Sequence, residues 1–163
     1  MELRRRWNFC KIFSLIYVLA FSVYIIVGLQ PAEAHEYTIS GNLNIPSIGL
    51  VSDVTNLTLE NHKLNTPDTI VGSYTRHLGK TLLIGHSTTV FKNLENISIG
   101  DTINYNDQNY RVINIEKIAK SNIDMDKILS REKENTLIVM TCAGTILDNG
   151  DASHRFIVTA TEI

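Results

Sequence analysis

Short apolar runs bounded by turn-forming residues follow one another from residue 37 to the C-terminus. Runs of this length are typical of β-strands, and their spacing of roughly 8–20 residues is typical of a sandwich or a barrel. We therefore predict a mainly β domain with seven to eight strands. The predicted strands are Tyr37–Ile45, Ile48–Val51, Thr69–Tyr74, Thr81–Ile84, Asp101–Tyr105, Tyr110–Ile118, Leu137–Thr141 and Phe156–Thr161.

Helices are expected to be short and few in the same region. Thr88–Leu94 and Ile123–Ser130 are the two candidates. Asp124 and Asp126 lie near the start of the second candidate, where the helix dipole favours negative charge. Polar residues 106–109 separate two predicted strands and are expected to form a hairpin connection.

The N-terminus has a different pattern, in which three arginines at positions 4–6 precede an uncharged apolar stretch. Ile12–Leu29 would form a helix of about 27 Å, close to the thickness of a bilayer's hydrocarbon core. Because the basic residues come first, the N-terminus is expected in the cytoplasm and the rest outside. We predict a basic start and single membrane anchor at 1–29, a linker at 30–38 and an exported domain at 39–163.

Two other interpretations of the N-terminal segment remain open. Ala32-Glu-Ala34 fits the small-x-small pattern of a signal-peptidase site, so the segment is alternatively a cleaved signal peptide. The apolar stretch is longer than the usual 7–15 residues of a signal peptide, which favours the anchor. A buried core helix is the third and weakest interpretation.

Charge and cysteine content narrow the function classes. The net charge of −2 and pI near 6.2 argue against a phosphate-binding surface, so nucleic acid is excluded as an expected partner. The chain has two cysteines, Cys10 beside the predicted anchor and Cys142 in the exported part. Cys142 has no exported partner, which excludes a disulfide framework. An unpaired exported thiol indicates either chemical use or deep burial.

Three chemically distinct residues lie at the edges of predicted strands. His86 follows one apolar run, Cys142 closes another, and Arg155 opens the last. Side chains alternate between the two faces of a strand, so Cys142 shares a face with residues 138 and 140, and Arg155 with residues 157 and 159. If these two strands are neighbours, Cys142 and Arg155 project from the same face.

Together these residues predict acyl transfer through a thioester. The thiolate is the attacking form of cysteine, and nearby positive charge or a base raises its population. The guanidinium of Arg155 is permanently charged and suits an oxygen that develops negative charge. Histidine is the residue type most often used as a general acid and base, so His86 can protonate a leaving amine and then deprotonate an incoming one.

These residues resemble the signature of the sortases, cysteine transpeptidases of Gram-positive-type cell surfaces. The family motif Thr-Leu-x-Thr-Cys corresponds to residues 138–142, with Thr141-Cys142 retained and the first two positions changed. Ile138 lacks the hydroxyl group that threonine would bring. The family's histidine follows a strand, as His86 does, and its arginine opens the last strand, as Arg155 does. Further segments resemble the family in the expected order: Asn44–Gly49, Phe91–Leu94 and Ile99–Ile103.

The resemblance covers residues 39–163 and implies a sortase-like closed β-barrel. It implies that Cys142 is the nucleophile, His86 the acid and base, and Arg155 the residue that stabilises the oxyanion or positions substrate. It implies cleavage of a C-terminal signal similar to Leu-Pro-x-Thr-Gly on surface proteins. The acyl group would pass to an amine of a cell-wall precursor or a pilin lysine. Three neighbours of the cysteine are candidate substrate contacts: Thr141, Ala143 and Gly144.

Two further expectations concern the surroundings of the cysteine. Ala143–Ser153 is predicted to be a flexible loop that borders the substrate groove. No cofactor and no metal site are expected, because one cysteine with scattered histidines has no ligand spacing. Some sortases bind calcium through acidic loops, but here the acidic residues are predicted to form a solvated face. Those residues are Asp124, Asp126, Glu132 and Glu134, and the histidines interpreted as ordinary are His35, His62, His77 and His154.

Two alternative functions remain at this stage. The first is an L,D-transpeptidase-like enzyme that cross-links peptidoglycan, although that family places glycine before its cysteine and this chain has Thr141 there. The second is a non-catalytic, membrane-tethered β-domain with an inert thiol. The inert-domain alternative predicts that replacing Cys142 changes nothing measurable.

Overall fold

The computed structural model describes residues 37–61, 63–77, 79–131 and 134–163. They belong to one compact unit, Tyr37–Ile163. The predicted anchor, Cys10, His35, His62 and Glu132 lie outside the described residues. Among the residues that are described, no helix is long and apolar enough to cross a membrane.

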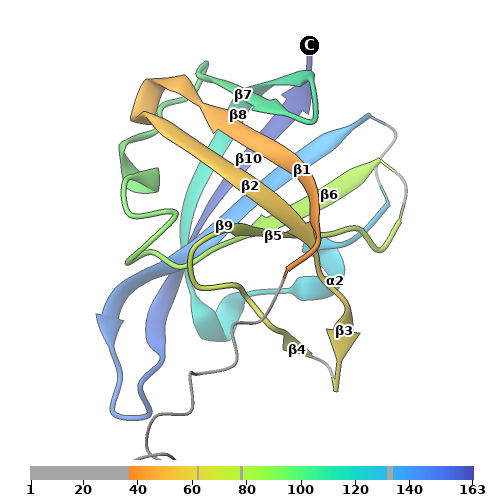
Figure 1. Ribbon diagram of the computed structural model, residues 1–163. Coiled ribbons are helices and arrows are strands. Elements are labelled where there is room, and N and C mark those ends of the chain that lie inside the picture. Colours follow the sequence, from red (N-terminus) through yellow and green to blue (C-terminus); the bar gives the residue numbers. More distant parts are fainter. Residues whose placement is uncertain (1–36, 62, 78, 132–133) are drawn as a thin grey trace, which may run out of the picture. The chain divides into compact units, whose positions relative to one another are not determined.

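Eight strands of the described chain close into a barrel, which confirms the predicted mainly β fold (Figure 1). Neighbours around the barrel are β1-β2-β5-β6-β9-β10-β8-β7. The pairs β2–β5 and β6–β9 are parallel and the other pairs are antiparallel. The strands are β1 (Ile39–Ile45), β2 (Leu50–Asn56), β5 (Val71–Tyr74), β6 (Lys80–Ile84), β7 (Thr102–Tyr105), β8 (Gln108–Ala119), β9 (Thr136–Ile146) and β10 (Ala152–Glu162).

The remaining elements are small. Strands β3 (Leu59–Glu60) and β4 (Lys63–Leu64) form a separate two-stranded sheet. Helix α2 is a single turn, Met125–Ile128, and three short 3₁₀ segments complete the described elements: η1 (Pro46–Ile48), η2 (Leu94–Asn96) and η3 (Lys120–Asn122). Figure 1 shows β3, β4 and α2 at one end of the barrel, from which the β9–β10 hairpin also projects.

Two apolar clusters hold this architecture together. The barrel interior buries alternate residues such as Leu83, Leu137 and Val139. A second cluster lies on the outer face of β6, β9 and β10, where Leu82 and Ile138 are covered by side chains of α2 and β4. These strands are therefore buried on both faces, which explains why their sequences read as continuous apolar runs without alternation.

Several predicted element boundaries are wrong, each for a local reason. Residues 46–48 form η1 and Gly49 has a φ of 64°, so the strand predicted at Ile48–Val51 begins at Leu50 and continues to Asn56. Asn106 and Asp107 have φ values of 48° and 63° and form the hairpin turn by themselves. Asparagine and aspartate tolerate such angles, so residues 108 and 109 are free to join β8.

The two helix predictions have different outcomes. Thr88–Leu94 is not an α-helix but a series of turns that ends in η2, with Phe91 N donating to the His86 carbonyl at 3.0 Å. Its β-branched threonines and valine disfavour a helix, and burial of Phe91 and Leu94 stabilises the turns instead. The second helix is confirmed in shortened form as α2, whose first turn is capped by the Asp124 side chain.

Candidate active site

Cys142 and Arg155 face each other across two neighbouring strands. Strands β9 and β10 are antiparallel, and their register pairs Arg155 with Cys142 and Ile157 with Met140. Ile157 and Met140 both belong to the outer cluster. Because side chains two residues apart share a face, Cys142 and Arg155 project from the outer face of the barrel. The prediction that they share a face is confirmed.

His86 approaches from the end of β6, on the other side of β9. Strands β6 and β9 are parallel, and Ile84 at the end of β6 pairs with Met140. His86 and Cys142 each lie two residues beyond this pair. The hydroxyl of Thr141 donates to the buried carbonyl of Gly85 at 2.7 Å. This bond joins the residue before Cys142 to the residue before His86.

The three residues line one pocket of about 260 Å³. Cys142 is a free thiol of intermediate burial, so its sulfur is not sealed inside the barrel. The outer cluster and the β4 region form the remaining walls. The full lining is Leu64, Thr66, Ile84, Gly85, His86, Met125, Met140, Thr141, Cys142 and Arg155.

The side chain of His86 is 41% accessible, compared with 16% for that of Arg155. Its Nε2 lies 3.7 Å from Oδ1 of Asp68, a carboxylate that is itself 95% exposed, so the attraction is weak in water. The turn that follows His86 packs closely on the preceding glycine. A Cβ at Gly85 would lie 2.5 Å from Val90 Cγ1 and 2.8 Å from Phe91, so only glycine fits at this position.

Arg155 is held firmly by residues of its own hairpin, with 16% of its side chain accessible. Nη1 donates to the carbonyl oxygens of Ala152 at 3.1 Å and His154 at 3.0 Å. Nη2 donates to Oδ1 of Asp151 at 2.9 Å. The guanidinium therefore has a defined orientation in the residue that lines the pocket with Cys142.

The three predicted substrate contacts beside Cys142 do not lie together, because successive side chains of β9 point to opposite faces. Thr141 lines the pocket, but Ala143 and Gly144 are not among its described lining residues. The Ala143 side chain is buried in the barrel interior. Gly144 is exposed, with a φ of 81°, and lies further along the strand.

The predicted flexible loop Ala143–Ser153 is largely strand, because β9 continues to Ile146 and β10 begins at Ala152. Only residues 147–151 connect the two strands. The register changes between Ala152 and His154, where Gly144 and Thr145 lie opposite Ser153. This arrangement is a β-bulge with glycine at positive φ, a feature that bends a hairpin without interrupting it.

Two of the four acidic residues considered for calcium have other side-chain contacts. Asp124 accepts a hydrogen bond from the Lys127 backbone N–H at 3.0 Å and so caps α2. Asp126 pairs with Arg76 at 2.8 Å. Across the described residues, no group of three or more His, Cys, Asp or Glu side chains is arranged to hold a metal ion.

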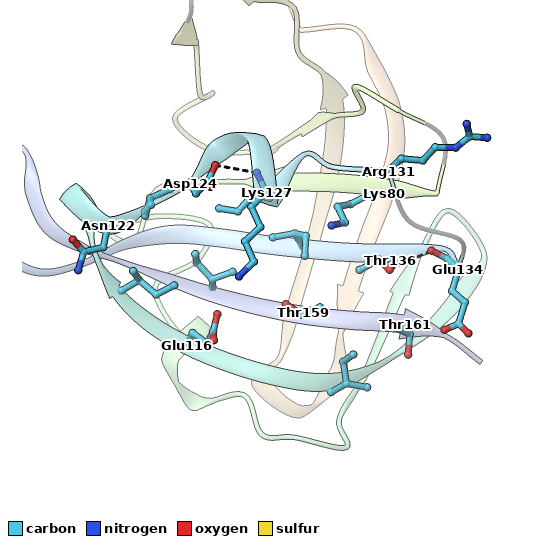
Figure 2. Close-up of a pocket in the computed structure, with 16 residues that line it drawn as sticks. Lys80, Glu116, Asn122, Asp124, Lys127, Arg131, Glu134, Thr136, Thr159 and Thr161 are labelled. Atoms are coloured by element: carbon cyan, nitrogen blue, oxygen red, sulfur yellow. Dashed lines mark hydrogen bonds between the residues drawn. The ribbon is translucent and has the colours of Figure 1, made fainter.

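Sequence reasoning missed a larger groove on the same outer face (Figure 2). It has a volume of about 910 Å³, and its floor includes Ile138 and Ile157, two residues along each strand from Met140 and Arg155. Lys127 extends from α2 over these strands, while Arg131 points away from them. The alternation of β9 and β10 predicts this floor, but residues 122–131, several of which line the groove, have no periodic signal.

Asp151 and the pocket wall formed by Leu64, Thr66 and Met125 were also missed. The wall residues lie far from Cys142 in sequence and have no motif. Asp151 lies four residues before Arg155, in a connection whose path depends on the bulge at Gly144. Nothing in the local sequence distinguishes it from the neighbouring Asp148.

Comparisons with known proteins agree with this fold. The family model described as "Sortase domain" matches residues 43–163. A lid mutant of sortase A from Corynebacterium diphtheriae superposes with a TM-score of 0.62 at 20% identity, covering 80% of this chain and 73% of that one. Sortase A from Listeria monocytogenes gives a TM-score of 0.60 at 17% identity, with 77% and 87% covered. Sortase C-1 from Actinomyces oris gives 0.60 at 23% identity, with 82% of both chains covered.

These structural matches, at low identity, show a shared fold. No curated protein matches the chain. The family match extends over most of the described residues and favours the sortase interpretation of the sequence. It argues against both the L,D-transpeptidase and the inert β-domain.

Proposed function

The chain belongs to the sortase family of cysteine transpeptidases, and from this premise we propose that it cleaves a Leu-Pro-x-Thr-Gly-like C-terminal signal with Cys142 as nucleophile. Sortases in general act on proteins that carry a sorting signal. The acceptor proposed here is an amine of a cell-wall precursor or a pilin lysine. The observation that carries the proposal is the single pocket lined by Cys142, His86 and Arg155.

The first half-reaction forms a thioester. The Cys142 thiolate attacks the carbonyl carbon of the threonine in the signal, and the oxygen gains negative charge that the Arg155 guanidinium stabilises. The C–N bond to glycine then breaks, and protonated His86 gives its proton to the departing amine. The products are a thioester on Cys142 and a free glycine-containing peptide.

The second half-reaction transfers the acyl group. Neutral His86 accepts a proton from the acceptor amine as the amine attacks the thioester carbon. The C–S bond breaks, the thiolate is restored and a new amide bond joins the surface protein to its acceptor. Both half-reactions use the same pocket, and neither requires a cofactor.

Mutation of the pocket residues tests this proposal on the full chain in detergent, with a fluorogenic signal peptide and an amine acceptor. We expect Cys142→Ala to abolish transpeptidation, and His86→Ala and Arg155→Ala to reduce it by about 10²-fold or more. The matched control is Cys10→Ala, which removes the other thiol and should retain activity. Mass spectrometry should find the thioester on Cys142, and turnover by Cys142→Ala would contradict the proposal.

We further propose that residues 1–29 anchor the protein in the cell membrane by a single pass, with the catalytic domain outside. The apolar stretch Ile12–Leu29 and the arginines before it support this placement. Cell fractionation should recover the full-length chain with membranes, and protease added to intact protoplasts should digest the catalytic domain. A mature chain beginning near His35 in the medium would instead establish a cleaved signal peptide.

A further inference from the structure

The Asp151 carboxylate is fixed on several sides. Oδ1 accepts from the backbone N–H of Ala152 at 2.8 Å as well as from Arg155 Nη2 at 2.9 Å. Oδ2 pairs with the ammonium group of Lys120, which belongs to η3 at the end of β8. The backbone carbonyl of Asp151 accepts from Leu147 N at 2.8 Å and so closes the hairpin turn. One carboxylate therefore connects β8, the hairpin turn and β10.

The bonds to Arg155 leave part of its donor capacity available. A guanidinium carries five N–H donors. Nη1 uses its hydrogens on two backbone carbonyls, and Nη2 uses one on Asp151. Within the described part of the chain, the Nε–H and one Nη2–H have no protein acceptor. Because Arg155 lines the pocket with Cys142, these two donors are the ones available to an oxygen of a bound substrate.

The position of the pair makes it stronger than an ordinary surface ion pair. Only 16% of the Arg155 side chain and 28% of the Asp151 side chain are accessible. Exposed pairs of long side chains contribute little, because they lose side-chain entropy and are screened by water. Here the carboxylate is already fixed by the Ala152 N–H and Lys120, so it orients the planar guanidinium at little further entropic cost.

We propose that Asp151 is the positioning residue of Arg155 and that Lys120 holds Asp151 in place for this role. The inference rests on the function proposed above. Asp151 is not among the described lining residues of the pocket, but it selects the Arg155 orientation in which the two remaining donors face the oxygen of the carbonyl group that Cys142 attacks. Donors that are oriented before the reaction stabilise a transition state without reorganisation. Loss of Asp151 should therefore slow the chemical step more than it weakens substrate binding.

Asp151→Asn tests the inference in the full chain with the signal peptide, since it removes the charge and keeps the shape. We expect kcat to fall about tenfold or more while KM changes less than about twofold. Asp148→Asn is the matched control and should leave both kcat and KM unchanged. Asp148 is an exposed carboxylate of the same turn, with no side-chain hydrogen bond or ion pair to the described residues. An unchanged or increased kcat for Asp151→Asn would overturn the inference.

A double-mutant cycle separates positioning from a structural effect on the hairpin. Arg155→Lys keeps the charge but loses the planar fork, so adding Asp151→Asn to it should cause less than about a twofold further loss. Equal losses from Asp151→Asn in the wild-type and Arg155→Lys backgrounds would mean that Asp151 acts independently of Arg155, and would also overturn the inference.

Lys120→Met provides a second variant if Asp151→Asn fails to fold. The substitution keeps the ion pair between Asp151 and Arg155 but removes the ammonium group that holds the Asp151 carboxylate. We expect kcat to fall about threefold in the wild-type background and to stay unchanged in the Arg155→Lys background. If Lys120→Met leaves kcat unchanged in both backgrounds, the role proposed for Lys120 and Asp151 is contradicted. Full activity of Arg155→Ala would instead contradict the catalytic role proposed for Arg155 itself, which distinguishes failure of this inference from failure of the proposed function.

Discussion

Thr141 shows how a residue outside the chemistry can determine the geometry of the pocket. Its side chain points to the interior side of β9, and its hydroxyl group donates to the carbonyl of Gly85. The next residues along the two chain segments are Cys142 and His86, whose side chains reach the outer pocket. The threonine retained in the Thr-Cys motif therefore has a structural explanation.

Thr141→Val should lower both stability and activity. Valine has the same shape but leaves the buried Gly85 carbonyl without its donor, at a cost of about 1–3 kcal/mol. Urea unfolding should detect this loss, and peptide cleavage should slow because His86 is less well placed. Thr136→Val on the same strand breaks only an exposed bond to the Glu134 carbonyl and should change stability by less than about 0.5 kcal/mol. Equal stability of the two variants would contradict this role.

Residue chemistry made three of the site residues recognisable before the fold was known. An unpaired cysteine, a histidine and an arginine at strand edges indicate acyl transfer because few residue types can do that chemistry. Asp151 was not recognisable, because its partners Lys120 and Arg155 meet only through the folded hairpin. A positioning role has no chemical signature of its own in the sequence.

Among the elements, the β9–β10 hairpin has the greatest effect on the site. It pairs Cys142 with Arg155, and its bulge at Gly144 bends the end that carries Asp151. Gly144 has a positive φ. A Cβ at this position would collide with Ser153 Oγ and would lie 2.8 Å from His154 Nδ1. Glycine is therefore required by both backbone conformation and space.

Gly144→Ala should destabilise the domain more than Gly150→Ala. Both glycines have a positive φ, 81° and 79°, so each alanine costs about 1–2 kcal/mol of backbone strain. A Cβ at Gly150 meets nothing within 4 Å, whereas one at Gly144 clashes, which should add about 1–3 kcal/mol. Thermal unfolding of the two variants measures the difference. A Gly144 variant as stable as the Gly150 variant would mean that the hairpin can shift to accept a side chain.

Element predictions succeeded where local signals and packing agreed. Asp124 was expected at a helix start, and it caps α2. Thr88–Leu94 failed because burial of Phe91 and Leu94, together with bonds to the His86 carbonyl, favours consecutive turns. The same turns pack on Gly85 and help to place His86.

At the scale of the whole molecule, two apolar clusters share one wall of the barrel. Adjacent residues of β6 point in opposite directions, Leu83 into the barrel and Leu82 into the outer cluster. Both are fully buried. Residues of α2 and β4 in the outer cluster also form part of the wall of the pocket lined by Cys142, so packing of this cluster supports the candidate site directly.

Leu82→Ala and Leu83→Ala should each cost about 2–5 kcal/mol, because each leaves a cavity in a packed cluster. Chemical denaturation measures this directly. Only Leu82→Ala should also impair peptide cleavage at temperatures where the variant is folded, since its cluster supports Met125 and Met140 in the pocket. A small cost for Leu82→Ala would mean that the outer cluster contributes little to folding.

The amino-acid sequence alone determined the class of the fold and the three candidate site residues, because apolar runs and residue chemistry are local properties. It also determined that Cys142 and Arg155 would share a face if their strands were neighbours, since side chains alternate along a strand. Only the tertiary structure decided that they are neighbours, that His86 arrives beside them through the parallel β6–β9 pair, and that Asp151 and Lys120 meet Arg155. These relations depend on strand order and register, which arise from packing between residues far apart in the chain.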